Sequence, residues 1–440
     1  MLPHIQPNET SEVKDPMPSK TDSRDSKDLL VNNLIYRQPK ELSLAKSRTN
    51  VKQFFQRSDY IAAQGKTAIC EWNTGSSYID TFNSHLVFNL SVTVDSSGVS
   101  DTVTFGRGSA MNLINNITIR TKSGSEVERL EDANLWSYTD VQYVMPRNYK
   151  RTVGSLFGMD QQYIGLSSEQ PKFVFKLAIP LTRLCPFFRP LKGQLMPPQL
   201  ASGLHIQVVF ENQFKPFVLG SGLNPVISYD VTDIHFLLDS VELSDEAQKA
   251  INLQSADNGL EWTTPRIYRS PQQIKAGVTQ VTTQIRKAVT QATQAYAVLQ
   301  PLTITDSKVD KFASIPTSNR VKFQFNIGSI YFPSQRAEDR YASYPIASYI
   351  EAMKSYDKSK HPYAGCDVTL ADFRTTSGIY AMTASRDDSL LLSGLNISNS
   401  RVLQFRYEGD DNTGADKIMT VFLEYMQVCK LYMNNSVVSI

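Results

Sequence analysis

The sequence predicts an all-β protein that consists of two tandem eight-stranded jelly-roll β-sandwiches, each with a short inserted helix. Three observations lead to this fold class. A chain of 440 residues suits two domains of roughly 200 residues each. Long segments alternate apolar and polar residues, as half-buried strands do. The order of strand-like and helical segments then recurs about 200 residues later, which indicates a duplicated domain.

The first 50 residues predict a flexible polar arm that becomes basic toward its end. Residues 1–28 mix charges without periodicity, which is typical of a disordered segment. The following cations are opposed only by Glu41: Arg37, Lys40, Lys46, Arg48, Lys52 and Arg57. Such a segment either contacts phosphate groups or an acidic neighbour, or serves as a solvated linker.

Residues 51–243 predict the first jelly roll. Its clearest strand is Thr81–Val94, after an earlier one at Lys66–Asn73. One face of the clearest strand carries Phe82, Leu86, Phe88, Leu90, Val92 and Val94, and the other carries Asn83, His85, Asn89, Ser91 and Thr93. Alternation over this length predicts a strand with one face in the core of a sandwich.

A strand, a turn and a helix follow in the first half. We expect a strand over Met111–Thr121 and a helix over Glu126–Met145, which Pro146 ends. The remaining predicted strands are Lys172–Leu181, Gly203–Glu211 and Tyr229–Leu243. Between them, Cys185–Pro198 contains four prolines and is expected to be irregular.

Residues 244–260 predict a helical linker, and residues 261–440 predict the second jelly roll. Arg336-Ala-Glu-Asp matches Arg129-Leu-Glu-Asp at an offset of 336 − 129 = 207, and Glu261-Trp262 matches Glu71-Trp72. We expect a helix over Arg336–Met353 as the counterpart of the first helix. The predicted strands of this half are Gly277–Arg286, Gln294–Thr305, Val321–Ile327, Gly378–Ala384, Arg401–Tyr407 and Ile418–Tyr432.

The histidines and cysteines do not predict a metal site. The five histidines are His4, His85, His205, His235 and His361, and no two form a His-x-His pair. We expect His85, His205 and His235 to face solvent or an interface. The four cysteines are Cys70, Cys185, Cys366 and Cys429, without CxxC spacing. They predict buried thiols in a reducing compartment.

Other polar motifs also favour structural roles, so we expect neither a catalytic residue nor a cofactor. Glu131-Asp132 and Glu338-Asp339 have the composition of an acid–base pair, but helix capping explains them better. Gly106-Arg-Gly-Ser predicts a turn. Asp387-Asp388 and Asp410-Asp411 predict solvated turns, with weak cation binding as the alternative.

Charge and hydropathy exclude two further classes. A formal net charge of +2 is too small for a protein built around attraction to nucleic acid. The sequence lacks an apolar run of about 18 residues, so we expect no membrane span.

The sequence resembles one protein family from Val51 to the C-terminus. The stretches that carry the likeness are Ser77-Tyr-Ile-Asp-Thr-Phe-Asn-Ser-His-Leu-Val-Phe-Asn-Leu, Asn112-Leu-Ile-Asn-Asn-Ile-Thr-Ile-Arg-Thr and Glu131-Asp-Ala-Asn-Leu-Trp. They resemble the double jelly-roll major capsid proteins of small icosahedral double-stranded DNA viruses. Those of polinton-like viruses and virophages are the most similar.

The resemblance implies a structural protein of the virion. Three copies would form a pseudo-hexameric homotrimer, and trimers would tile an icosahedral shell alongside penton and minor capsid proteins. Assembly would take place in a reducing host compartment, either the cytoplasm or the nucleus. The six cations of Arg37–Arg57 would lie near the inner surface and contact neighbouring capsomers, minor capsid proteins or packaged DNA. The long loops Cys185–Pro198 and Ser355–Thr375 would be sites of contact and of display on the outer surface.

Two alternatives from other classes stay open. A double jelly-roll glycan-active enzyme would need carboxylates clustered between the sandwiches, and usually a secretion signal. A non-catalytic carbohydrate-binding attachment protein would expose aromatic side chains on one sheet.

Overall fold

A computed structural model describes most of the chain from Ala45 onward. The described residues are 45–95, 101–107, 109–159, 164–166, 172–212, 215–219, 226–303, 309–314, 320–341, 343–357, 367–384, 394–398, 401–409, 415–431 and 437–439. Residues 45–440 form one compact unit, and the structural statements below concern its described part.

The first half of this unit is built on two four-stranded antiparallel sheets. One sheet has the order β1-β11-β3-β8, with bounds Ala45–Phe54, Val226–Leu243, Tyr78–Asp95 and Lys172–Pro180. The other has the order β2-β9-β5-β6, with bounds Thr67–Glu71, His205–Phe210, Ile114–Arg120 and Glu126–Leu130. Chain neighbours are divided between the two sheets, as in a jelly roll.

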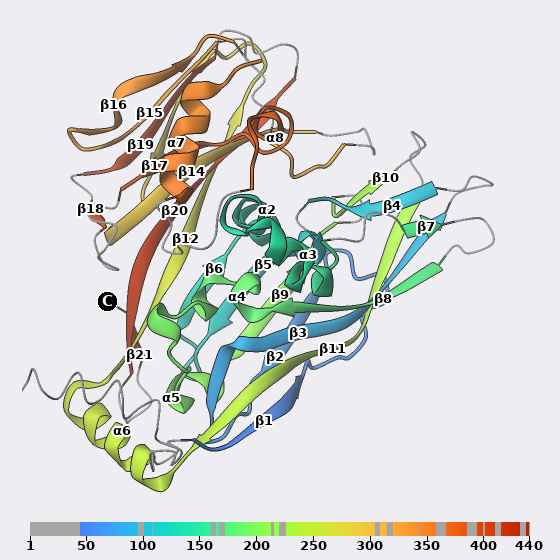
Figure 1. Ribbon diagram of the computed structural model, residues 1–440, viewed down its shortest axis with the longest axis vertical. Helices are drawn as coiled ribbons and strands as arrows, with labels where there is room; N and C mark the ends of the chain where they lie inside the picture. Colours follow the sequence, from blue (N-terminus) through green and yellow to red (C-terminus); the bar gives the residue numbers. More distant parts are fainter. Residues whose placement is uncertain are drawn as a thin grey trace, which may run out of the picture. The chain divides into compact units, whose positions relative to one another are not determined.

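The second half repeats this order strand for strand (Figure 1). Its first sheet is β12-β20-β14-β17, with bounds Leu260–Ile274, Lys417–Leu431, Val289–Pro301 and Tyr380–Thr383. Its second sheet is β13-β19-β15-β16, with bounds Gln280–Ile285, Leu403–Gly409, Val321–Ile327 and Ile330–Asp339. The prediction of two tandem eight-stranded jelly rolls is therefore confirmed.

Further strands form one small separate sheet in the first half and extend one sheet in the second. A three-stranded sheet in the first half is formed by β10 Phe217–Leu219, β4 Asp101–Phe105 and β7 Ile164–Leu166. In the second half, β18 Leu395–Ile397 pairs with β14, and β21 Val437–Ser439 pairs with β20.

A helix occupies the same topological position in each half. The helix α2, Ala133–Val144, follows β6, and α7, Ile346–Asp357, follows β16 (Figure 1). The segment 244–260 holds α6, Asp245–Asn258, which confirms its helical prediction. The shorter helices are η1 Ser109–Leu113, α3 Arg147–Arg151, η2 Val153–Phe157, α4 Leu181–Leu184, η3 Pro186–Phe188, η4 Leu191–Gly193, α5 Pro198–Ala201 and α8 Leu370–Thr375.

Both predicted helices begin later than the sequence suggested. Glu126–Leu130 forms β6, which pairs with β5 through Ile117 opposite Leu130. Arg336–Asp339 likewise belongs to β16. Glu, Arg and Leu favour helices in isolation, but pairing with a neighbouring strand and burial of the apolar side chains outweigh that weak preference. The Arg-x-Glu-Asp match thus marks equivalent hairpins rather than equivalent helices.

Two other sequence matches need correction. Glu261-Trp262 begins β12, whose counterpart in the strand order is β1, whereas Glu71-Trp72 lies at the end of β2. That dipeptide match was therefore wrong. Phe82 is 48% exposed because the pairing of β3 with β11 shifts register beside it. The predicted alternation holds farther along, at Leu86–Val92.

The strand β1 includes residues that we had assigned to the arm. Ala45–Asn50 pairs with β11 between Leu243 and Asp239, so these residues belong to the first sandwich. The division into residues 51–243, 244–260 and 261–440 otherwise stays a prediction.

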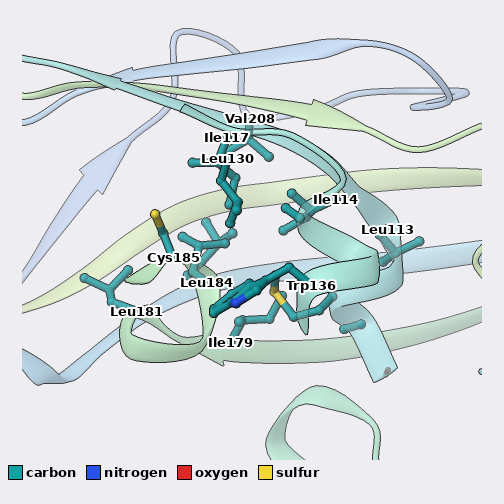
Figure 2. Close-up of a cluster of buried hydrophobic side chains, with 14 of the residues drawn as sticks. Leu113, Ile114, Ile117, Leu130, Trp136, Ile179, Leu181, Leu184, Cys185 and Val208 are labelled. Carbon is teal, nitrogen blue, oxygen red and sulfur yellow. The ribbon is translucent and has the colours of Figure 1, made fainter. Parts of the chain in front are cut away.

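The core consists of two apolar clusters. The larger fills the first sandwich and reaches the second half at Trp262, Tyr296 and Phe422. Figure 2 shows its centre, where Trp136 of α2 lies among aliphatic side chains that include Ile179 and Leu184. The smaller fills the second sandwich around Phe323 and Phe405. No helix in the described ranges is long and apolar enough to cross a membrane.

Candidate functional site: the contact between the two sandwiches

The helix α2 lies at the contact between the sandwiches and is buried on every side. Eleven of its residues, from Ala133 to Tyr143, are buried, so the helix lacks a solvent-facing stripe. Several of these residues are polar, and a buried polar group is costly unless it finds a partner. Their partners come from both halves of the chain.

Two tyrosines of α2 bind backbone carbonyls in the second half. The Tyr138 hydroxyl donates to the carbonyl of Thr376 at 3.1 Å, and the Tyr143 hydroxyl donates to that of Ser377 at 2.5 Å. The Tyr143 ring also stacks on Tyr356 of α7, with centroids 4.8 Å apart. These contacts fix α2 against the second sandwich.

Asp140 of α2 is held by two arginines of the first half. Its carboxylate accepts from Arg183 at 2.9 Å and from Arg189 at 2.7 and 2.9 Å. The Arg189 guanidinium also lies over the Trp136 ring, 4.9 Å from its centroid. Burial opposes ionisation of Asp140, but Arg189 and Arg183 outweigh it and hold the pKa of Asp140 below its ordinary value.

A second buried ion pair crosses directly between the sandwiches. Arg266 of β12 donates to the Glu128 carboxylate of β6 at 2.7 Å. The same guanidinium lies over the ring of Phe187, 4.8 Å from its centroid, and contacts the sulfur of Cys429 at 3.6 Å. Burial raises the pKa of Glu128, and Arg266 lowers it part of the way back. Beside this pair, the Trp262 indole donates to the Phe187 carbonyl at 3.3 Å.

An open pocket of about 370 Å³ lies beside the Arg266–Glu128 pair. Its lining is mostly charged and includes Glu126, Arg129, Glu131, Arg269 and Lys287. The acids among them contact arginines. Glu131 lies 3.1 Å from Arg129 and 3.6 Å from Arg269, and Glu126 lies 3.7 Å from Arg120. Each of these acids contacts an arginine, and such charge-assisted contacts favour a cohesive role.

The segment at Gly106 joins the sandwiches as well. The Arg107 amide donates to the Asp310 carboxylate at 2.9 Å, and its guanidinium donates to Asp372 at 3.0 Å. A Cβ atom on Gly106 would lie 2.7 Å from an Asp310 oxygen, so only glycine permits this approach. What the sequence presented as a simple turn is a contact between distant parts of the chain.

The paired carboxylates have different roles. Asp339 accepts from the amides of Ala347 and Ser348 at 2.7 and 3.0 Å, which confirms the capping prediction for this residue. Asp132 makes no capping bond; it lies 2.5 Å from the guanidinium of Arg269 instead. Capping was therefore the wrong prediction for Asp132. Asp387-Asp388 and Asp410-Asp411 lie outside the described residues.

The structure describes three of the histidines and three of the cysteines. Within the described part, no group of three or more His, Cys, Asp or Glu side chains is arranged to hold a metal ion. His235 is buried against the Phe54 ring, so a solvent-facing position was wrong for it. His4, His361 and Cys366 lie outside the described residues. The other cysteines, Cys70, Cys185 and Cys429, are buried free thiols, as predicted.

The basic residues predicted for the inner face are only partly described. Arg37 and Lys40 lie outside the described residues, while Lys46, Lys52 and Arg57 are exposed. Arg48 instead pairs with Asp80 at 2.5 Å and with Asp239 at 2.6 Å. Those carboxylates lie on β3 and β11, so Arg48 holds the first sheet together. The segment Cys185–Pro198 was expected to serve contact and outward display. Its first part, Cys185–Phe188, is buried, and Phe187 lies against Trp262 of the second half, whereas Gly193 and Gln194 are exposed.

Sequence reasoning missed the residues that join the sandwiches. Glu128 and Arg266 are buried charged residues, and charged side chains are almost never buried without a partner. The partner could not be identified from sequence because 138 residues separate the two.

Comparisons with known proteins show the fold. No protein-family model matches the chain, and no curated protein sequence matches it. Among solved structures, the Faustovirus major capsid protein matches with a TM-score of 0.60 at 10% identity, covering 95% of each chain. A chain of the Sputnik virophage structure matches at 0.59 and 12% identity, covering 100% of this chain and 93% of that one. The mavirus major capsid protein matches at 0.54 and 11% identity, covering 99% and 97%. The chain therefore shares the double jelly-roll fold of these proteins.

Proposed function

We propose that the chain is a major capsid protein whose homotrimers tile an icosahedral viral shell. The observation that carries the proposal is the strand-for-strand duplication, shared over nearly the full length of capsid proteins of Faustovirus and mavirus. A threefold assembly of a duplicated chain presents six similar sandwiches, so it fills a sixfold position of a shell.

The polar chemistry of the contact between the sandwiches supports a structural role over a glycan-active one. The acids that line the pocket contact Arg266, Arg129, Arg269 and Arg120. These ion pairs stabilise the contact between the two β-sandwiches. A glycoside hydrolase would instead need a free carboxylic acid opposite a carboxylate.

Trimer and shell formation provide the main test of this function. The full chain is purified and measured by light scattering and by negative-stain electron microscopy. We expect trimers with a pseudo-hexagonal outline that assemble into closed shells with penton and minor capsid proteins. A chain that stays monomeric at all concentrations, or that cleaves glycans through Glu128 or Glu131, would overturn the proposal. Glu128→Gln and Glu131→Gln variants identify the second outcome.

The basic arm is proposed to act on the inner face of the shell. Lys46, Lys52 and Arg57, which are exposed, would lie there with Arg37 and Lys40 and would contact neighbouring capsomers, minor capsid proteins or packaged DNA. Three buried thiols suit assembly in a reducing host compartment before the protein enters the virion.

Because β1 begins at Ala45, the arm is tested by removing residues 1–44 only. We expect this deletion to leave trimers intact and to impair shell assembly. A Lys46→Gln/Lys52→Gln variant of the full chain removes two of the proposed cations and keeps the strand, and we expect it to weaken shell assembly as well. The matched control is Lys249→Gln, at an exposed lysine of α6. Normal shells from the shortened chain would contradict the role of the arm.

A further inference from the structure

We infer that an apolar surface on the second sandwich docks head to tail onto β1 of a second copy of this chain. The inference deepens the proposed trimer by naming the two surfaces that form its interface. It follows from a comparison of equivalent elements in the two halves: each joins the sandwiches in one half, and its counterpart in the other half leaves apolar residues exposed.

The first surface surrounds the start of α7. It carries Tyr341 and Tyr344, which are 68% and 64% exposed, and Ile346 and Ile350, which are 51% and 44% exposed. The two isoleucines are four residues apart and share one face of the helix. We call these four residues the α7 surface. A cluster of large apolar side chains in water marks a contact site.

The counterpart of α7 in the first half shows what this helix position does. α2 follows the equivalent hairpin, and its tyrosines bind the Thr376 and Ser377 carbonyls of the second sandwich. With the adjacent β6, it forms the first sandwich's side of the internal contact. α7 and β16 are the corresponding elements of the second sandwich, and the helix start remains exposed among the described residues.

The opposite side of the internal contact is formed by β12. Its Trp262 and Arg266 are each 1% exposed because the first sandwich covers them. The equivalent strand of the first half is β1, at the same edge of its sheet. β1 is exposed along most of its length, including Phe54 at 60% and Val51 at 38%.

The chain thus repeats both sides of its internal contact. The end of α7, at Tyr356, takes part in the internal contact, whereas the start of α7 and β1 are exposed. The α7 surface corresponds to the side formed by α2 and β6, and β1 corresponds to the side formed by β12. Because the two sides differ, docking one onto the other is heterologous and closes into a ring when the rotation permits. Three copies would then alternate internal and external contacts of the same kind around six sandwiches. Continuity with the internal contact therefore identifies a second copy as the occupant.

Two single substitutions test both surfaces. Ile350→Glu places a charge on the α7 surface, and Phe54→Glu places one on β1. The matched control is Leu253→Glu, since Leu253 of α6 is 70% exposed and belongs to neither surface. We expect wild type and Leu253→Glu to be trimers by mass photometry, and each test variant to be monomeric with a circular dichroism spectrum and melting curve close to wild type.

Mixing the two test variants gives the sharpest result. Ile350→Glu keeps an intact β1, and Phe54→Glu keeps an intact α7 surface, so one head-to-tail contact remains possible between them. We expect dimers in the mixture and monomers in each separate sample. A misfolded variant could not complement the other, so dimers also exclude a folding defect as the cause.

Other outcomes distinguish this inference from the proposed function. If both variants stay trimeric, or if only one dissociates, or if the mixture forms no dimers, the assigned surfaces are wrong while the capsid role stands. A wild-type chain that neither trimerises nor forms shells overturns the capsid role itself. If removal of residues 1–44 abolishes trimers, the interface is formed by that segment rather than by β1. If the wild-type chain binds glycans and a Tyr344→Ala variant does not, the α7 surface is a carbohydrate-binding site of an attachment protein.

Discussion

Arg266 and Glu128 form an ion pair at 2.7 Å between strands of different sandwiches, with side chains that are 1% and 3% exposed. Removing two charges from water costs several kcal/mol per ion, and their attraction returns this cost only with good geometry. Here the guanidinium also lies over the Phe187 ring and reaches Cys429. The pair therefore fixes how β6 and β12 meet, and its contribution to stability depends on both partners being present.

We expect Arg266→Met alone to lower the free energy of unfolding by about 3–5 kcal/mol, because it leaves Glu128 buried and unpaired. The double variant Glu128→Leu/Arg266→Met should regain most of this loss. Urea denaturation of the single and double variants measures the coupling. Arg336→Met is the control: its pair with Glu408 at 2.8 Å is partly exposed and should contribute less than about 1 kcal/mol. Additive effects at Glu128 and Arg266 would contradict the coupling.

The Asp140 cluster predicts an acid-sensitive contribution to stability. Burial opposes the charge on Asp140, but Arg189 and Arg183 hold its pKa below the ordinary value. A lowered carboxyl pKa stabilises the fold at pH values above the unfolded pKa of about 3.9, and this stabilisation is lost as the pH falls through the folded pKa. Asp140→Asn should therefore cost about 3–5 kcal/mol at pH 6, and progressively less below about pH 4.

Thermal unfolding of wild type and Asp140→Asn between pH 3 and pH 7 checks this dependence. Asp416→Asn is the control, since Asp416 contacts Lys275 at the surface and should change the melting temperature little. A difference between wild type and Asp140→Asn that stays constant across this pH range would show that the charge of Asp140 does not produce the effect.

Strand periodicity explains why the fold could be predicted from sequence. In β9, Ile206, Val208 and Phe210 alternate with less buried residues, as they must when one face lies in the core. The order of such strands revealed the duplication. β6 was missed because Glu126–Leu130 is a good helix sequence, and only its pairing with β5 makes it a strand.

The contact between the sandwiches could not be predicted in the same way. Tyr143 and the Ser377 carbonyl are 234 residues apart, and Arg266 and Glu128 are 138 apart. Periodicity identifies which side chains are buried but not the side chains they meet. The exposed α7 surface could not be predicted for a related reason: Ile346 and Ile350 have the spacing that apolar residues also have in a buried helix.

The buried thiols predict slow chemical modification of the native protein. Burial raises the pKa of Cys70 to about 12, and it also raises the pKa of Cys185. At pH 8 the Cys70 thiolate is then about one part in ten thousand, and the thiolate is the reactive form. In a Cys366→Ser background, a thiol reagent should label none of the other cysteines rapidly before denaturation and all of them afterwards. Rapid labelling of the native chain would show that the core opens readily.

The close approach at Gly106 gives a final prediction. A methyl group on this residue would lie 2.7 Å from the Asp310 carboxylate, which accepts the Arg107 amide. We expect Gly106→Ala to push Asp310 away and to lower the free energy of unfolding by about 1–3 kcal/mol, the usual cost of overpacking. Asp310→Ala breaks the same contact but leaves the Asn112 side-chain nitrogen 2.9 Å from the added methyl group, so Gly106→Ala should cost less in an Asp310→Ala background than in wild type. Urea denaturation of the three variants measures this, and additive losses would mean that Gly106 is required for a reason other than its approach to Asp310.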